Sequence, residues 1–95
     1  MEPIVFLTHA TDAIEDSHML VILRNMAGQD MPLAVKKTAV FWDIRQHVAI
    51  QLGLISNEIH LMLDYQELDN TARIYTMQPS LEANDNVVDL LVDAE

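Results

Sequence analysis

The side chains with the greatest potential for chemistry in this sequence are histidines and carboxylates, because the sequence contains no cysteine. The four histidines lie far apart, at His9, His18, His47 and His60. None of them has a second histidine or a carboxylate at a tight ligand spacing such as that of HExxH. Carboxylate pairs occur, for instance Asp64 with Glu67, but a polar turn is enough to explain them. We therefore expect no metal site.

The sequence supports nucleophilic catalysis no better than it supports a metal site. No serine stands in a recognisable relation to a histidine or lysine that would activate it. The absence of cysteine removes thiol nucleophiles, disulfides and thiolate metal sites together. There is also no glycine-rich loop for phosphate groups. The sequence predicts a protein that is not an enzyme, with no catalytic residue and no cofactor.

The charge balance limits the class of partner. Fifteen acidic residues oppose five basic ones, for a formal net charge of −10. Binding to nucleic acid or to an anionic membrane surface needs clustered Lys and Arg, so neither partner is expected. The longest apolar runs, such as residues 4–7 and 19–23, are far shorter than the roughly 20 residues that span a bilayer. Residues 1–18 contain no Lys or Arg and do not resemble a signal peptide. We expect an intracellular protein, in the cytoplasm or nucleus.

Length and composition predict one domain with a hydrophobic core. The chain has 95 residues, 51% of them hydrophobic. In residues 1–18 an apolar stretch at 4–7 precedes polar residues. This segment is expected to be an N-terminal extension, either flexible or forming an added edge strand, in front of a domain at residues 19–95.

The first half of that domain predicts a β-hairpin followed by a helix. Residues 20–25 are rich in strand formers, and residues 31–36 alternate with period two. Apolar residues then recur at three- and four-residue steps between Phe41 and Leu52. This spacing is typical of an amphipathic helix, with Thr38 as the expected N-cap and Gly53 as a left-handed C-cap.

The second half predicts more strands. Residues 59–63 alternate, Tyr65 and Gln66 are expected to form a turn, and residues 67–68 add a very short strand. An irregular stretch with a helical turn leads to a last strand at 87–92. The fold class is α+β, a mixed sheet of four to five strands packed on one helix. The β-grasp arrangement, with the last strand beside the first, is one of several α+β options.

Several spacings match one known family. Gly28 lies in the first hairpin turn, Val35 and Phe41 stand six residues apart, and Gly53 follows the helix. Residues 61–68 resemble a third strand, turn and short fourth strand without a gap. In these features residues 19–93 resemble the ubiquitin-like proteins, and residues 35–38 and 85–89 are similar to segments of the small ubiquitin-like modifier SUMO. The resemblance implies the β-grasp fold.

One feature of the family is missing. Its conjugated members end in a flexible tail with two glycines, whereas this sequence ends Asp93-Ala94-Glu95 and both of its glycines are internal. The resemblance therefore implies a non-conjugatable, acidic module or adaptor that binds partner proteins. The expected partners are proteins of the ubiquitin or SUMO pathway. The alternative is a structural or assembly subunit that self-associates as a homo-oligomer or scaffolds a complex.

Two candidate surfaces follow. If Ile59, Leu61 and Leu63 face the helix, Met62 must point to the opposite face of the sheet. By the resemblance, Met62 stands where ubiquitin has the centre of its apolar recognition patch. The remaining expected patch residues are Met26, Asp89, Leu91 and the neighbouring His60. An exposed cluster of this kind is a usable protein-binding surface. The alternative is that these are isolated exposed apolar residues, which are normal on protein surfaces.

The second candidate surface is a groove between the strand at 31–36 and the helix. In SUMO, the corresponding groove accepts short apolar peptides that are flanked by acidic residues. The resemblance to SUMO implies a similar site here. An open strand edge would pair with the peptide backbone, and Lys36, Lys37 and Arg45 would attract its acidic residues. The alternative is that these are ordinary solvated basic side chains.

Overall fold

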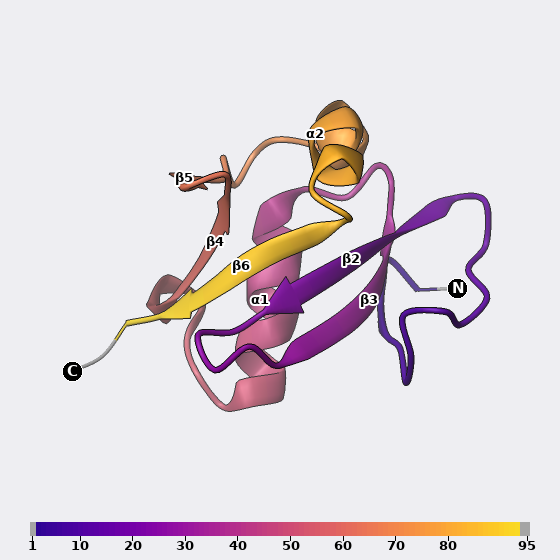
Figure 1. The fold of residues 1–95 in the computed structure, drawn as a ribbon. Helices are drawn as coiled ribbons and strands as arrows, with labels where there is room; N and C mark the ends of the chain where they lie inside the picture. Colours follow the sequence, from indigo (N-terminus) through magenta and orange to yellow (C-terminus); the bar gives the residue numbers. More distant parts are fainter. Residues whose placement is uncertain (1, 94–95) are drawn as a thin grey trace.

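The computed structural model describes residues 2–93 and shows an α+β protein (Figure 1). The expected domain extends to Glu95, but Ala94 and Glu95 lie outside the described residues. The elements in chain order are β1 (Ile4–Phe6), β2 (His18–Arg24), β3 (Asp30–Lys36), α1 (Phe41–Leu52), η1 (Ser56–Glu58), β4 (Ile59–Leu63), β5 (Gln66–Glu67), η2 (Ile74–Met77), α2 (Gln78–Ala83) and β6 (Val87–Val92).

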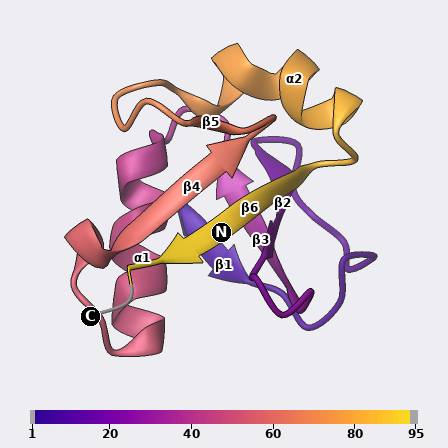
Figure 2. The ribbon, with the colours of Figure 1, turned by 60° about the vertical axis from the view of Figure 1, so that its left-hand side comes forward.

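All strands join one mixed sheet in the order β1-β3-β2-β6-β4-β5. β2 and β3 form the expected antiparallel hairpin. α1 then connects β3 to β4, which lies on the opposite side of β2 and β6 in the sheet. β6 lies between β2 and β4, parallel to β2 and antiparallel to β4. The expected position of the last strand beside the first strand of the hairpin is therefore confirmed. In Figure 2, β4 and β6 cross in front of α1, so the sheet has one face toward α1 and one away from it.

The sheet has six strands in the described residues, rather than four or five, because the N-terminal segment contributes β1. β1 pairs antiparallel with β3, with Ile4 opposite Val35. The backbone N–H of Lys36 donates to the Pro3 carbonyl, and that of Leu7 donates to the Pro32 carbonyl. Ile4 is buried in the core with 3% of its surface exposed. Of the two alternatives for residues 4–7, the structure has the added edge strand.

α1 begins two residues later than a Thr38 cap implies. Val40 is the N-cap, and its backbone N–H donates to the Asp43 carboxylate over 3.1 Å. Val40 also forms a β-bridge with Arg73, which holds the chain extended up to the helix. The prediction of Thr38 as N-cap is therefore wrong. Gly53 is a C-cap with φ of 71°, as expected, a conformation that costs glycine little.

The stretch between β5 and β6 contains more helix than expected. It begins with the 3₁₀ turn η2 and continues as α2, a helix of six residues with Pro79 in its first turn. Asn86 then anchors the entry to β6, because its side-chain amide donates to the Leu20 carbonyl over 2.7 Å. Neither α1 nor α2, the helices of residues 2–93, has the length and apolar character needed to cross a bilayer.

The core lies between α1 and one face of the sheet. Phe41, Ile44 and Val48 of α1 are fully buried. Opposite them, Ile59, Leu61 and Leu63 of β4 are buried, whereas His60 and Met62 are half-buried, which is the alternation that the sequence predicted. The register of β4 is therefore confirmed, and Met62 belongs to the sheet face away from α1.

Candidate protein-binding surface

The pairing of β4 with β6 brings the expected patch residues together. Met62 lies directly opposite Asp89, and His60 lies opposite Leu91. Residues directly opposite on neighbouring antiparallel strands have their Cβ atoms about 4.5–5.5 Å apart and on the same face. All four side chains therefore form one continuous strip on the sheet face away from α1.

The end of this strip near the β2–β3 turn is hollowed. The hollow has a volume of about 360 Å³ and we call it the Met62 hollow. It is lined by Arg24, Asn25, Met26, Met62, Tyr65, Asp89, Leu90 and Leu91. Four of the five expected patch residues therefore meet at one concave site. The fifth, His60, does not line the hollow but lies opposite its lining residue Leu91 on the β4–β6 ladder. Of the two lining methionines, Met26 is 84% exposed and Met62 is half-buried.

Tyr65 is the most exposed of the four lining residues that were not expected from the sequence, the others being Arg24, Asn25 and Leu90. The β4–β5 turn comprises Asp64 and Tyr65, one residue earlier than expected, because Leu63 pairs with Gln66. A two-residue turn of this kind requires positive φ at both positions, and the φ angles are 54° and 65°. The left-handed region is uncommon for a bulky aromatic residue. The turn holds the Tyr65 ring 95% exposed at the margin of the Met62 hollow.

The charge beside the hollow is mainly acidic. Its one lining base, Arg24, is already engaged in a two-point ion pair with Asp30, at 2.8 Å and 3.1 Å. The hydrogen bond and charge of Asp30 raise the pKa of Arg24, and nearby Asp89 adds a smaller effect in the same direction. Asp89 itself is exposed. The site therefore offers exposed apolar side chains beside a carboxylate.

His60 forms a clamp beside this surface. Its Nδ1 lies 2.7 Å from Oε1 of Glu67 on β5, and its Nε2 lies 2.9 Å from Oδ1 of Asp93 just after β6. The hydrogen bond with Glu67, and next that with Asp93, raise the pKa of His60. The imidazolium form therefore ties the edge of the sheet together. Within residues 2–93, no three His, Asp or Glu side chains are grouped so that they could hold a metal ion.

This clamp predicts a pH dependence of stability. Because the folded-state pKa of His60 is above its ordinary value of 6.5, its stabilisation is fully present below that value. It is lost as the pH rises through the folded pKa. We expect the difference in unfolding free energy between the native chain and His60→Gln to be larger at pH about 6 than at pH about 9. Chemical denaturation at both pH values measures it.

The control is His47→Gln, because His47 is an exposed histidine of α1 whose ring contacts the Asp43 backbone carbonyl and, within residues 2–93, no carboxylate. For this variant, the difference in unfolding free energy from the native chain should change less between the two pH values than it does for His60→Gln. An equal change for both variants would contradict the clamp.

The residues of the expected peptide groove lie apart. β1 already pairs with the edge of β3 between that strand and α1, so the open edge that the groove requires is filled by the chain itself (Figure 2). Lys36 is exposed at the end of β3, and Lys37 is half-buried.

Arg45 does not face this edge as a free cation. Only 7% of its surface is exposed. Its guanidinium donates to the Asn70 side chain over 2.8 Å and to the Ser56 carbonyl over 3.0 Å, and it lies 5.2 Å from the centre of the Trp42 ring. Arg45 therefore joins α1 to the loops beside it, and the structure does not bring it together with Lys36 and Lys37 into one basic site.

Comparisons with known proteins add no identification. A scan against protein-family models finds no match for this chain, and a search of curated proteins finds no significant match.

Proposed function

We propose that this protein is a non-conjugatable, ubiquitin-like module of β-grasp type that binds a partner protein through the sheet face around the Met62 hollow. The observation that carries the proposal is the convergence of Met26, Met62, Asp89 and Leu91, from three separate segments, on one apolar hollow. The order of the strands around α1 supports the β-grasp arrangement. The resemblance to ubiquitin and SUMO makes intracellular proteins of those pathways the expected partners.

The physical basis is burial of apolar surface. Exposed methionine and aromatic side chains provide flexible and rigid contact area respectively, and such residues dominate the binding energy of many interfaces. Tyr65 is the strongest candidate anchor, because its ring is almost fully exposed and its position is held by a two-residue turn. A backbone conformation unfavourable for tyrosine, at a cost on the order of 1 kcal/mol, is a feature that clusters at functional sites.

Two substitutions test this function by capture of partner proteins from a lysate, followed by titration of the purified partner. Met62→Arg should abolish binding, because an unpaired guanidinium loses its hydration at the centre of an interface. Tyr65→Gly should weaken binding strongly, because it removes the exposed ring. The same variant should melt no lower than the native chain, because glycine relieves the left-handed backbone strain.

Ile50→Arg is the matched control. It places the same charge on an apolar residue of α1 that is 79% exposed and outside the Met62 hollow. Native affinity in this control, with loss in the other two variants, supports the sheet face. Undiminished binding by Met62→Arg would overturn the proposal. A mass that doubles with concentration and that Met62→Arg returns to monomer would instead assign this face to self-association, the alternative function.

A further inference from the structure

The two-residue β4–β5 turn places one side chain in each of two separate hollows. Tyr65 lines the Met62 hollow, whereas Asp64 lines a second hollow on the other side of the hairpin. Both residues have left-handed backbone angles. Aspartate tolerates this conformation better than most residues. The turn that exposes the tyrosine therefore also directs a carboxylate toward α2.

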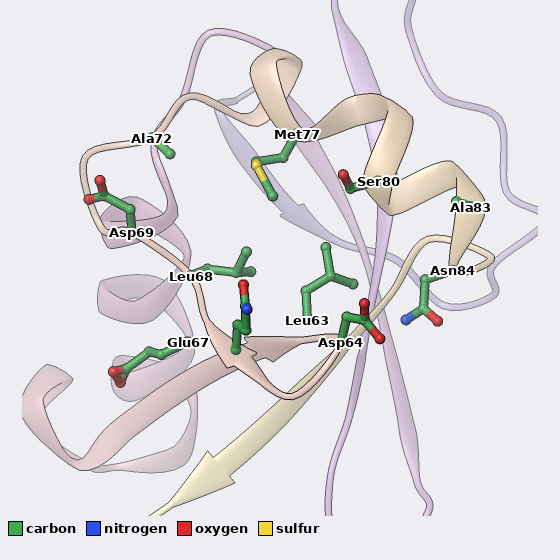
Figure 3. A pocket seen from close by; sticks show the side chains of 11 residues that line it. Leu63, Asp64, Glu67, Leu68, Asp69, Ala72, Met77, Ser80, Ala83 and Asn84 are labelled. Carbon is green, nitrogen blue, oxygen red and sulfur yellow. The ribbon is translucent and has the colours of Figure 1, made fainter.

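The second hollow lies between the β4–β5 hairpin and α2, and we call it the α2 hollow. Its volume is about 520 Å³, within the range of small ligand sites. Figure 3 shows Leu63, Leu68 and Met77 pointing into it from the hairpin, the following loop and the η2 turn. Leu63 and Leu68 are buried, with 6% and 8% of their surface exposed. The floor of the α2 hollow is therefore apolar.

The rim of the α2 hollow carries oxygen acceptors and no base. Asp64 and Ser80 point toward it in Figure 3. The structure gives the exposed Asp64 side chain no hydrogen bond or ion pair within residues 2–93. Asp69 also lines the hollow, and the backbone N–H and hydroxyl of Thr71 donate to its Oδ1 over 2.9 Å and 2.8 Å. These two hydrogen bonds lower the pKa of Asp69 and keep it ionised. Glu67 is directed away, toward His60.

An apolar floor below an acidic rim matches one kind of side chain. Lysine and arginine have an apolar stem and a cationic head, and they cover apolar surface with the stem while the head stays near water or an acid. A purely apolar occupant would desolvate Asp64 without compensation, and an acidic one would be repelled. Charge complementarity therefore selects a cationic occupant.

We propose that the α2 hollow is a second docking site, which binds a lysine or arginine side chain of a flexible basic peptide segment. The stem lies on Leu63, Leu68 and Met77, and the head pairs with Asp64. This site does not depend on the Met62 hollow, because the two share no lining residue. A basic segment is attracted by the whole chain as well, whose formal charge is −10.

The test uses a capped peptide with an arginine-leucine-arginine centre between glycines, and a second peptide with glutamate in place of arginine. Methyl NMR of the full-length chain reads binding directly, because Met77 lines the α2 hollow while Met26 and Met62 line the other. We expect the arginine peptide to shift the Met77 methyl signal in a saturable manner that weakens with added salt. The glutamate peptide should leave the signal unchanged.

Two variants and one control complete the test. Asp64→Asn should weaken peptide binding about fivefold, the effect of losing one partly exposed charge pair, and asparagine tolerates the same left-handed backbone. Ala83→Phe, at an exposed position of α2 on the rim, should block the hollow without changing charge. Asp85→Asn makes the same change of charge at another exposed, left-handed position that does not line the hollow, and should bind like the native chain.

Selective loss in Asp64→Asn and Ala83→Phe, with Met62→Arg binding the peptide normally, would support the site. The inference is overturned if the Met77 signal does not move at millimolar peptide, or if only Met26 and Met62 move. Equal weakening by Asp64→Asn and Asp85→Asn would also overturn it, since the attraction would then be a property of the net charge. Because the readout uses Met77 and a defined peptide, its failure leaves the test of the Met62 hollow intact.

Discussion

Replacing Ile44 with alanine is expected to lower the free energy of unfolding by about 2–5 kcal/mol, the usual cost of truncating a buried large aliphatic side chain. Ile44 lies on the face of α1 toward the sheet and none of its surface is exposed. The loss combines reduced apolar burial with a cavity that a well-packed core closes only in part. Urea denaturation followed by circular dichroism measures the change.

Ile50→Ala is the control for that substitution, since it makes the same change in the same helix at a residue that is 79% exposed. Its effect should stay within about 0.5 kcal/mol. Leu61→Ala and Met62→Ala repeat the comparison on β4, with a large loss at Leu61 and one of about 1 kcal/mol or less at the half-buried Met62. Equal losses within either pair would contradict the assigned faces of α1 or β4.

Removal of residues 1–7 is expected to lower the free energy of unfolding by about 2 kcal/mol or more, because burial of one isoleucine side chain is worth about 1.5–3 kcal/mol. Ile4 is the one residue of β1 that is buried, and β1 also satisfies backbone groups of β3. The shortened chain should still fold, since the other strands and α1 form the rest of the core. Its denaturation midpoint gives the result.

Ile4→Ala in the full-length chain separates the contribution of the side chain from that of strand pairing, and it should account for most of the loss. An unchanged midpoint after truncation would mean that β1 does not pack on the core in solution. The same result would leave the edge of β3 open, as the groove hypothesis requires.

Much of the fold was predictable because its signals are local and periodic. The alternation on β4 placed Met62 on the correct face, and the apolar repeat through Ile44 identified α1. The glycine at the end of that helix marked its C-cap, since few other residues adopt the left-handed conformation at low cost. The grouping of Asp89 and Leu91 with Met62 was expected only from the resemblance to ubiquitin, and the pairing of β4 with β6 brings these residues together.

The features that were not predicted depend on contacts between distant segments. The burial of Arg45 requires Asn70 and Ser56, and its position on a helix gives no sign of either partner. The N-cap at Val40 depends on its bridge to Arg73. A tyrosine in a left-handed turn opposes ordinary propensities, so the position of Tyr65 beside the Met62 hollow could be found only from the pairing of Leu63 with Gln66.

The methionine side chains report directly on which face of the protein meets the partner. Met26 and Met62 line the proposed surface, whereas Met19 is a core residue with 7% of its surface exposed. The decisive measurement is methyl NMR of the full-length chain, labelled at methionine, during titration with the purified partner. We predict that the Met26 and Met62 signals shift or broaden first and most strongly, with little change at Met19. Unchanged Met26 and Met62 signals in a saturated complex would contradict recognition through the Met62 hollow.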